Sequence, residues 1–317
     1  MTKTYGELFA GIGGASVGLK AAGYHGSWAV EHNQGAIDIL AANHDIDRII
    51  HDDVCEVDYN LLPDVDVLWA SPPCPSFSRA NHKGGETWSD MELAHAIVAA
   101  ATRAQSVIIE NVPTYRESRS FATIDLGLIS GGFTYSTHMI LNASDYGNRS
   151  SRSRFYAIFS RSRFAPINLP QSRSWWFGAL LDAIDHWEPS KLTVNQTKAI
   201  EVAGVDLATS MPFAIERCGY YGSPKLIATG SVFPCCKSHP GHDGKNPKTG
   251  RGKIGSYRRQ YDFVYQGQSY ALTHQLMGLL MGFPINYDWG ADRGQAVAGI
   301  GNAVVPAMAE LLARSIG

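Results

Sequence analysis

Residues 65–78 read VDVLWASPPCPSFS, and the interpretation of the whole chain starts from this stretch. The apolar run Val65 to Ala70 predicts a buried strand of a parallel sheet, because such strands are covered on both faces. Two prolines and Cys74 follow, so we expect the thiol just beyond the carboxyl end of a strand, where open α/β sheets bind ligands. This position favours a nucleophilic cysteine. The alternative is a small buried hydrophobic residue, which most free cysteines are.

Composition and charge limit the class of protein. The chain has 317 residues, 44% of them hydrophobic and 18% charged, which is typical of a globular enzyme with one or two domains. We expect no membrane span and no signal peptide, since no apolar run reaches about 18 residues. Five unevenly spaced cysteines favour a reduced, cytoplasmic protein. The net charge is −2, but residues 237–259 hold seven Lys or Arg against one Asp, so contact with a polyanion is expected there.

Strand and helix patterns alternate along the first half of the chain. The predicted strands are Tyr5 to Phe9, Ser27 to Val30, Arg48 to Ile50, Val65 to Ala70, Ser106 to Ile109, Thr134 to Leu141 and Phe155 to Phe159. The predicted helices between them are Ala15 to Ala22, Gln34 to Asn43, Asp90 to Arg103 and Ser118 to Ser130. This alternation predicts an α/β fold with a doubly wound, mostly parallel sheet.

The pattern changes after Pro166. A helix is predicted over Ser174 to Trp187, and residues 189–268 predict a smaller, loop-rich domain with short β segments at Lys225 to Ala228 and Tyr261 to Tyr265. Helical periodicity returns at Leu272 to Met281 and at Pro306 to Ile316.

Several polar groups follow the predicted strands. The glycine-rich turn after Phe9 would let a ligand approach the backbone at a helix N-terminus, although a tight turn needs glycine for steric reasons as well. Glu31 ends the second strand, where an acid is well placed to hold ribose hydroxyls. Asp53 and Glu110 also follow strands, so we expect both at the same rim of the sheet as Cys74.

In their order and spacing, these motifs resemble those of the cytosine-C5 DNA methyltransferases over nearly the whole chain. The matching segments are FAGIGG (9–14), Glu31, Asp53-Val54, SPPCP (71–75), ENV (110–112), RSR (152–154), GFP (282–284) and GNAVVP (301–306). The chain departs from the family pattern at Ser150, Tyr270, Gln275, Leu276 and Val305. These departures concern how two domains are braced, and none removes a reacting group.

The resemblance implies a catalytic set of Cys74, Glu110, Arg152 and Arg154. Cys74 would add to carbon 6 of a cytosine and activate carbon 5 as a nucleophile. Glu110 would hold N3 and the exocyclic amine, a role that suits a carboxyl whose pKa burial raises towards neutrality. The two arginines would stabilise the base carbonyl and the sulfur. Their alternative role is a phosphate-binding or salt-bridge pair.

The resemblance also implies S-adenosylmethionine as cofactor, with S-adenosylhomocysteine as product. The cofactor-binding candidates are Phe9, Gly11, Ile12, Gly13, Glu31, Asp53, Val54, Pro73, Asn302 and Val304. Asn302 could instead cap the last helix. The partner would be double-stranded DNA with the target cytosine flipped out of the helix. The DNA-binding candidates are Ser78, Arg79, Lys83, Arg251, Lys253, Arg258 and Arg259.

By the same resemblance, residues 1–175 and 296–317 form a Rossmann-like catalytic domain of the class I methyltransferase type, and residues 176–295 form a target-recognition domain and hinge. We expect a monomer of prokaryotic or phage origin. A cognate restriction endonuclease is a possible partner that the sequence leaves open. The alternatives are methylation of RNA on the same scaffold and a catalytically silent DNA-binding homologue. A nicotinamide-dependent oxidoreductase is disfavoured because the turn lacks a third spaced glycine. No metal is expected, because the adjacent Cys235 and Cys236 do not fit the usual zinc spacings with His239 and His242.

Overall fold

The computed structural model describes residues 2–73, 85–164, 167, 169–217, 223–234 and 261–316. Contacts divide the chain into two compact units, which we describe separately. The first unit comprises Met1–Tyr146, Arg152–Ser172 and Ala303–Gly317. The second unit comprises Gly147–Ser151 and Arg173–Asn302.

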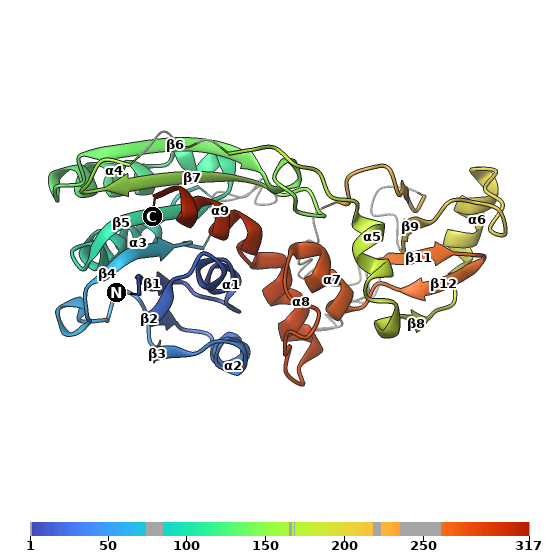
Figure 1. Cartoon of the computed structure of the whole chain (residues 1–317), viewed down its shortest axis with the longest axis horizontal. Helices are drawn as coiled ribbons and strands as arrows, with labels where there is room; N and C mark the ends of the chain where they lie inside the picture. The colour runs from blue at the N-terminus through green and yellow to red at the C-terminus, as the bar shows by residue number, and fades with distance from the viewer. Residues whose placement is uncertain are drawn as a thin grey trace. The chain divides into compact units, whose positions relative to one another are not determined.

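The first unit is built on a seven-stranded sheet (Figure 1). Its strands are β1 (Thr4–Leu8), β2 (His25–Glu31), β3 (Ile46–His51), β4 (Val65–Ala70), β5 (Ala104–Asn111), β6 (Tyr135–Asn142) and β7 (Ser153–Ser160). They lie in the order β3-β2-β1-β4-β5-β7-β6, and all pairs are parallel except those of β7, which runs antiparallel to β5 and β6. The prediction of a mostly parallel α/β sheet is therefore confirmed.

Helices cover both faces of this sheet (Figure 1). They are α1 (Gly14–Ala21), α2 (Gln34–Asn43), α3 (Trp88–Ala101), α4 (Arg119–Ser130) and α9 (Pro306–Ile316). Successive side chains of β2 point to opposite faces of the sheet. Trp28 and Val30 join the core under α3 and α4, whereas Ala29 packs with Leu40 of α2. The inner strands β2, β4 and β5 are buried at nearly every position and are therefore largely apolar, whereas the edge strands β3 and β6 have exposed positions.

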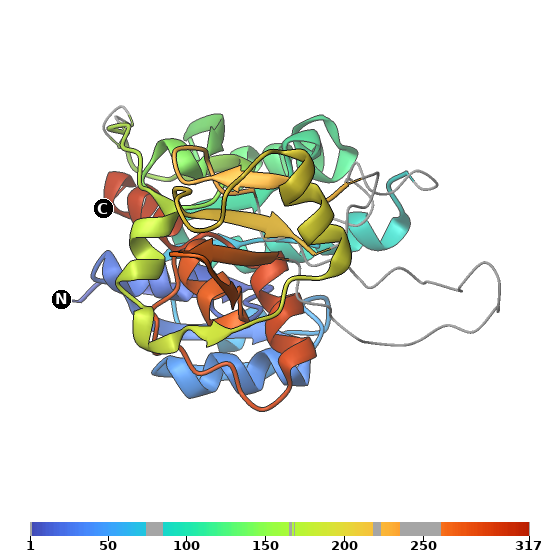
Figure 2. The ribbon, with the colours of Figure 1, turned by 90° about the vertical axis from the view of Figure 1, so that its right-hand side faces the viewer.

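The second unit contains a smaller, antiparallel sheet. Its strands are β8 (Glu188–Pro189), β9 (Phe213–Glu216), β10 (Leu226–Ala228), β11 (Tyr261–Tyr265) and β12 (Gln268–Ala271), in the order β10-β9-β11-β12-β8. Its helices are α5 (Trp176–Leu181), α6 (Val194–Val202), α7 (His274–Met281) and α8 (Arg293–Asn302). Figure 2 shows α6 beside this sheet, and Ala199 and Ile200 of α6 pack with Phe213 and Ile215 of β9.

The predicted bounds agree fully for β4, α2, β11 and α9. Helix α3 begins two residues earlier than predicted, because Thr87 and Asp90 form a capping box at its start. The helix predicted over Ser174 to Trp187 is wrong as a single element. It consists of α5 and a separate 3-10 turn, Ile184–His186.

Helices α6 and α8 were missed by the sequence patterns. Residues 194–202 carry few apolar residues, so their helical period is weak, and a capping box between Thr193 and Gln196 marks the start of α6. Three glycines interrupt α8, and glycine disfavours helix in isolation. In both cases tertiary packing overrides the local signal.

In the described part of the chain, no single helix is long and apolar enough to span a membrane. Only α8 and α9 taken together, across a bend, meet that criterion of length and composition.

Candidate active site

The glycine-rich turn connects β1 to α1 through backbone conformations that favour glycine. Gly11 has a φ of 55° and Gly13, which precedes α1, has a φ of 88°. A Cβ at Gly13 would lie 2.6 Å from Nε2 of His44, so a side chain there would force His44 to shift. Phe9 also has a positive φ, of 58°. The turn therefore presents backbone at the start of α1, where no side chain caps the helix.

Glu31 connects this turn to the next helix. Its Oε2 accepts a hydrogen bond from the Gly11 N–H at 2.8 Å, and its Oε1 accepts from the N–H groups of His32 and Asn33 at 3.0 and 2.9 Å. The side chain is buried at the end of β2. A carboxylate has about four acceptor positions. His32 Nδ1 also lies 3.2 Å from Oε1. Glu31 therefore shapes the turn, and Oε2, which accepts from the Gly11 N–H, retains an acceptor position for a ligand.

The remaining first-unit cofactor candidates lie at the same edge of the sheet. Asp53 follows β3 and is exposed, with Oδ1 accepting from the Cys55 N–H at 2.9 Å, while Val54 is buried. Ile12 is buried within the turn. Val304 packs against the turn, since a Cβ at Gly14 would clash with its carbonyl oxygen.

The segment that leads into Cys74 is fixed on two sides. The Ser71 hydroxyl donates to the Phe9 carbonyl at 3.5 Å, next to the glycine-rich turn. Asn111 Nδ2 donates to the Pro72 carbonyl at 2.9 Å, at the end of β5. Pro73 is exposed and is the last described residue before Cys74. Ser71 and Pro72 therefore lie between the turn and the end of β5.

Glu110 and Arg154 form a buried ion pair beside this segment. Arg154 Nε lies 2.8 Å from Glu110 Oε1, and the side chains are 17% and 9% exposed. Arg152 is also buried, and its backbone N–H donates to Asn142 Oδ1 at 2.8 Å. Burial raises the pKa of the Glu110 carboxyl above its usual range, and the positive charges of Arg154 and Arg152 oppose that rise. Both predicted arginines therefore act on the predicted acid.

The other predicted residues are placed less completely. Asn302 is the last residue of α8 and belongs to the second unit, so it precedes α9 rather than capping it. The following candidates lie outside the described residues: Cys74, Ser78, Arg79, Lys83, Arg251, Lys253, Arg258, Arg259 and the cluster Cys235, Cys236, His239 and His242. Among the residues that are described, no group of His, Cys, Asp or Glu could hold a metal ion.

Glu7 is a buried acid that the motif analysis missed. It lies on β1, 1% exposed, and hydrogen-bonds with the Ser16 hydroxyl of α1. Burial raises the pKa of Glu7 to about 8; the Ser16 hydrogen bond opposes this and the charge of Glu31 adds to it. The available signal was an acid inside an otherwise apolar strand pattern, directly before the turn.

Comparison with known proteins identifies the family. The model of the C-5 cytosine-specific DNA methylase family matches residues 4–317, so the chain belongs to this family of DNA (cytosine-5-)-methyltransferases. It is 26% identical to the type II methyltransferase M1.HphI of Haemophilus parahaemolyticus over all of this chain and 87% of that protein. It is 22% identical to M.HhaI of the same species over 98% of this chain and 93% of that protein. The family implies S-adenosylmethionine as methyl donor and DNA as substrate.

The solved structures show the same fold. A prophage-encoded DNA modification methyltransferase of Escherichia coli superposes with a TM-score of 0.67 at 16% identity, over 99% of this chain and 98% of that one. Fission yeast Dnmt2 superposes with a TM-score of 0.59 at 16% identity, over 98% and 97% of the two chains. The predicted family, fold class and cytosine-C5 methyltransferase activity are therefore confirmed.

Proposed function

We propose that the chain methylates carbon 5 of a flipped-out cytosine in double-stranded DNA through a covalent adduct between Cys74 and carbon 6. The observation that carries this proposal is the buried Glu110–Arg154 pair at 2.8 Å, next to the anchored Pro72 that leads into Cys74. A carboxyl with a raised pKa and an arginine, both beside an expected thiol, are the groups that cytosine activation needs.

The residues of the first unit fit S-adenosylmethionine. Gly11 and Gly13 leave the backbone open, α1 begins without a side-chain cap, and Glu31 retains an acceptor position at the turn. We propose that Glu31 holds the ribose hydroxyls and that Asp53 and Val54 face the adenine. Phe9, Ile12, Pro73, Asn302 and Val304 would complete the cofactor site. When bound, the cofactor supplies an electrophilic methyl group.

The proposed chemistry uses the chain's own groups in order. The Cys74 thiolate adds to carbon 6, and Glu110 donates a proton or hydrogen bond to N3 as negative charge develops on the ring. Arg154 and Arg152 stabilise the charge on the base carbonyl and near the sulfur. Carbon 5 would take the methyl group that the bound cofactor supplies, and the methyl–sulfur bond would break to leave S-adenosylhomocysteine. Loss of the carbon-5 proton to a base or water then restores the double bond, and the thiolate leaves.

The second unit would act as the DNA-recognition domain. We propose that residues 176–295 read the target sequence and that Arg251, Lys253, Arg258 and Arg259 contact DNA phosphates and bases. Ser78, Arg79 and Lys83 would contact the DNA around the flipped-out cytosine. The type II names of the relatives support a cognate restriction endonuclease as a further partner. The monomeric enzyme would act on DNA in the cytoplasm of a prokaryotic cell.

The test is transfer of labelled methyl from S-adenosylmethionine to unmethylated DNA, with Cys74→Ser in parallel. We expect label in DNA with the wild type only, while both proteins bind the cofactor equally. Sequencing at methylcytosine resolution then gives the target site. Substantial turnover by Cys74→Ser would contradict the covalent step, and label in tRNA but not in DNA would contradict the substrate.

A further inference from the structure

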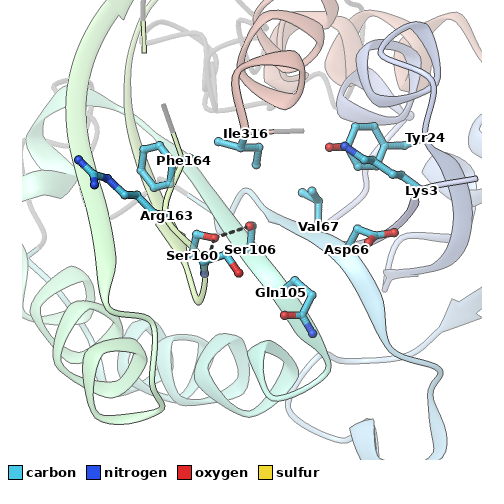
Figure 3. Close-up of a pocket in the computed structure, with 11 residues that line it drawn as sticks. Lys3, Tyr24, Asp66, Val67, Gln105, Ser106, Ser160, Arg163, Phe164 and Ile316 are labelled. Carbon is cyan, nitrogen blue, oxygen red and sulfur yellow. Dashed lines mark hydrogen bonds between the residues drawn. The ribbon is translucent and has the colours of Figure 1, made fainter. Parts of the chain in front are cut away.

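The first unit contains a cavity of about 170 Å³ at the amino-terminal edge of its sheet (Figure 3). Its lining comes from the residues before β1 and β2, the starts of β4 and β5, the end of β7 with the segment after it, and the end of α9. The candidate active-site residues lie at the opposite, carboxyl edge, where β2 ends at Glu31 and β5 ends at Asn111. The cavity is therefore separate from the proposed cofactor and cytosine sites.

The lining includes a buried hydroxyl proton that has no acceptor. Ser106 Oγ and Ser160 Oγ lie 2.9 Å apart and share one hydrogen bond, and the Ser162 N–H donates to Ser160 Oγ at 3.2 Å. Two serines carry two hydroxyl protons, and only one is used between them. No described group accepts the other, although both side chains are at least nine-tenths buried. A buried donor without an acceptor is costly, so this pair is suited to a ligand that accepts a hydrogen bond.

The charges around the cavity favour an anionic ligand. Lys3 makes no ion pair with any described residue, and its Nζ lies 5.8 Å from the centroid of the Tyr24 ring. Lys3 and Arg163 are the two cations of the lining and Asp66 is its one carboxylate, so the lining carries a net charge of +1. Asp66 Oδ2 accepts from the Thr4 N–H at 2.7 Å and from the Thr4 hydroxyl at 3.4 Å. Figure 3 shows Lys3 beside Tyr24 at one side of the lining and Arg163 at the other.

The size and the apolar part of the lining restrict the ligand further. Val67, Phe164 and Ile316 supply hydrocarbon surface at the cavity. A volume of about 170 Å³ is smaller than the ~300–1,000 Å³ of sites for drug-sized ligands. We propose that this cavity binds a small organic anion, in which a carboxylate or phosphate group meets the serine pair and Lys3 and a short apolar body meets the hydrocarbon surface.

The experiment uses benzoate, phenyl phosphate and inorganic phosphate as probes. Binding is measured by calorimetry on the full chain with S-adenosylhomocysteine at saturation, so that the cofactor site is blocked. We expect one-to-one binding of benzoate or phenyl phosphate, tighter than inorganic phosphate, and the better of the two identifies the anionic group. Ser160→Ala and Lys3→Ala should each weaken that binding by about tenfold, as loss of a hydrogen bond to a charged group does.

Two matched variants control for the loss of any buried hydroxyl and of any surface charge. Ser27→Ala removes an equally buried hydroxyl from β2, and Arg48→Ala removes an exposed charge from β3; both should bind the probes as the wild type does. Absence of binding by all three probes would overturn the proposal. Equal weakening by Ser160→Ala and Ser27→Ala, or displacement of the probe by S-adenosylhomocysteine, would also overturn it. Methyl transfer is measured separately, so failure here leaves the proposed function unaffected.

Discussion

Replacing Glu110 with Gln tests the proposed acid directly. The substitution keeps the shape of the side chain but removes its charge and its transferable proton. General acid–base groups contribute about 10²- to 10⁴-fold to rates, and we expect kcat/KM to fall within that range. The variant also leaves Arg154, 2.8 Å away and only 17% exposed, without its anionic partner. We expect this to reduce the free energy of unfolding by about 1–3 kcal/mol.

The pH dependence gives the sharper readout. Burial raises the pKa of Glu110, so protonated carboxyl persists above the usual range of glutamate. If the protonated form serves N3, kcat/KM falls as pH rises through that raised pKa. The need for a Cys74 thiolate gives the opposite limb, so rate falls as pH decreases. In Glu110→Gln the alkaline limb should disappear and the acidic limb should remain.

The assay is methyl transfer to duplex DNA between about pH 5 and pH 9, a range that extends upwards from the usual pKa of a glutamate past that of a cysteine thiol. Glu117→Gln is the matched control, because Glu117 is an exposed carboxylate in the turn that follows β5. A Glu110→Gln enzyme with wild-type kcat/KM, or one that retains the alkaline limb, would refute the role of Glu110 as the acid at N3.

Three further predictions concern the turn and its surroundings. Glu31→Ala should weaken S-adenosylmethionine binding by about 1–3 kcal/mol, through loss of charged hydrogen bonds; unchanged affinity in calorimetry would remove Glu31 from the ribose. Gly13→Ala should weaken cofactor binding and lower Tm more than Gly23→Ala, since both have positive φ but only Gly13 faces His44; equal Tm losses would rule out the His44 contact as the cause. Glu7 has a pKa of about 8 when folded against 4.5 otherwise, so the folded state binds the extra proton and stability should fall as pH rises from about 4.5 to about 8. Urea unfolding should show this fall in the wild type and not in Glu7→Gln, and parallel pH curves would contradict the burial argument.

The motifs gave reliable positions along the chain because each has a local physical cause. Val65 to Ala70 is a continuous apolar run, and such runs are buried strands wherever the sheet is covered on both faces. Gly13 is required by a backbone conformation that the residue itself adopts. Glu31 ends the next strand after the glycine-rich turn, at a distance set by one helical crossover. These features depend on neighbours in sequence, and a reader of the sequence can find them.

Elements with weak local signals were the ones missed. Helix α6 is stabilised by Ala199 and Ile200, which pack against β9. Two apolar residues are too few to give a visible helical periodicity in the sequence. The break after α5 likewise depends on tertiary surroundings, since residues 174–187 read as one helix. Propensity is a weak prior, and packing outweighs it over short segments.

The sequence by itself therefore determined the family, the α/β class, the chemical type of each reacting group and its order along the chain. Only the tertiary structure decided which groups act on each other. Glu110 and Arg154 are far apart in sequence and meet because β7 inserts antiparallel beside β5. The raised pKa values of Glu110 and Glu7 also come from burial, which is a property of the folded surroundings. Distance and dielectric environment exist only after folding, and these two quantities set the strength of every charge in the site.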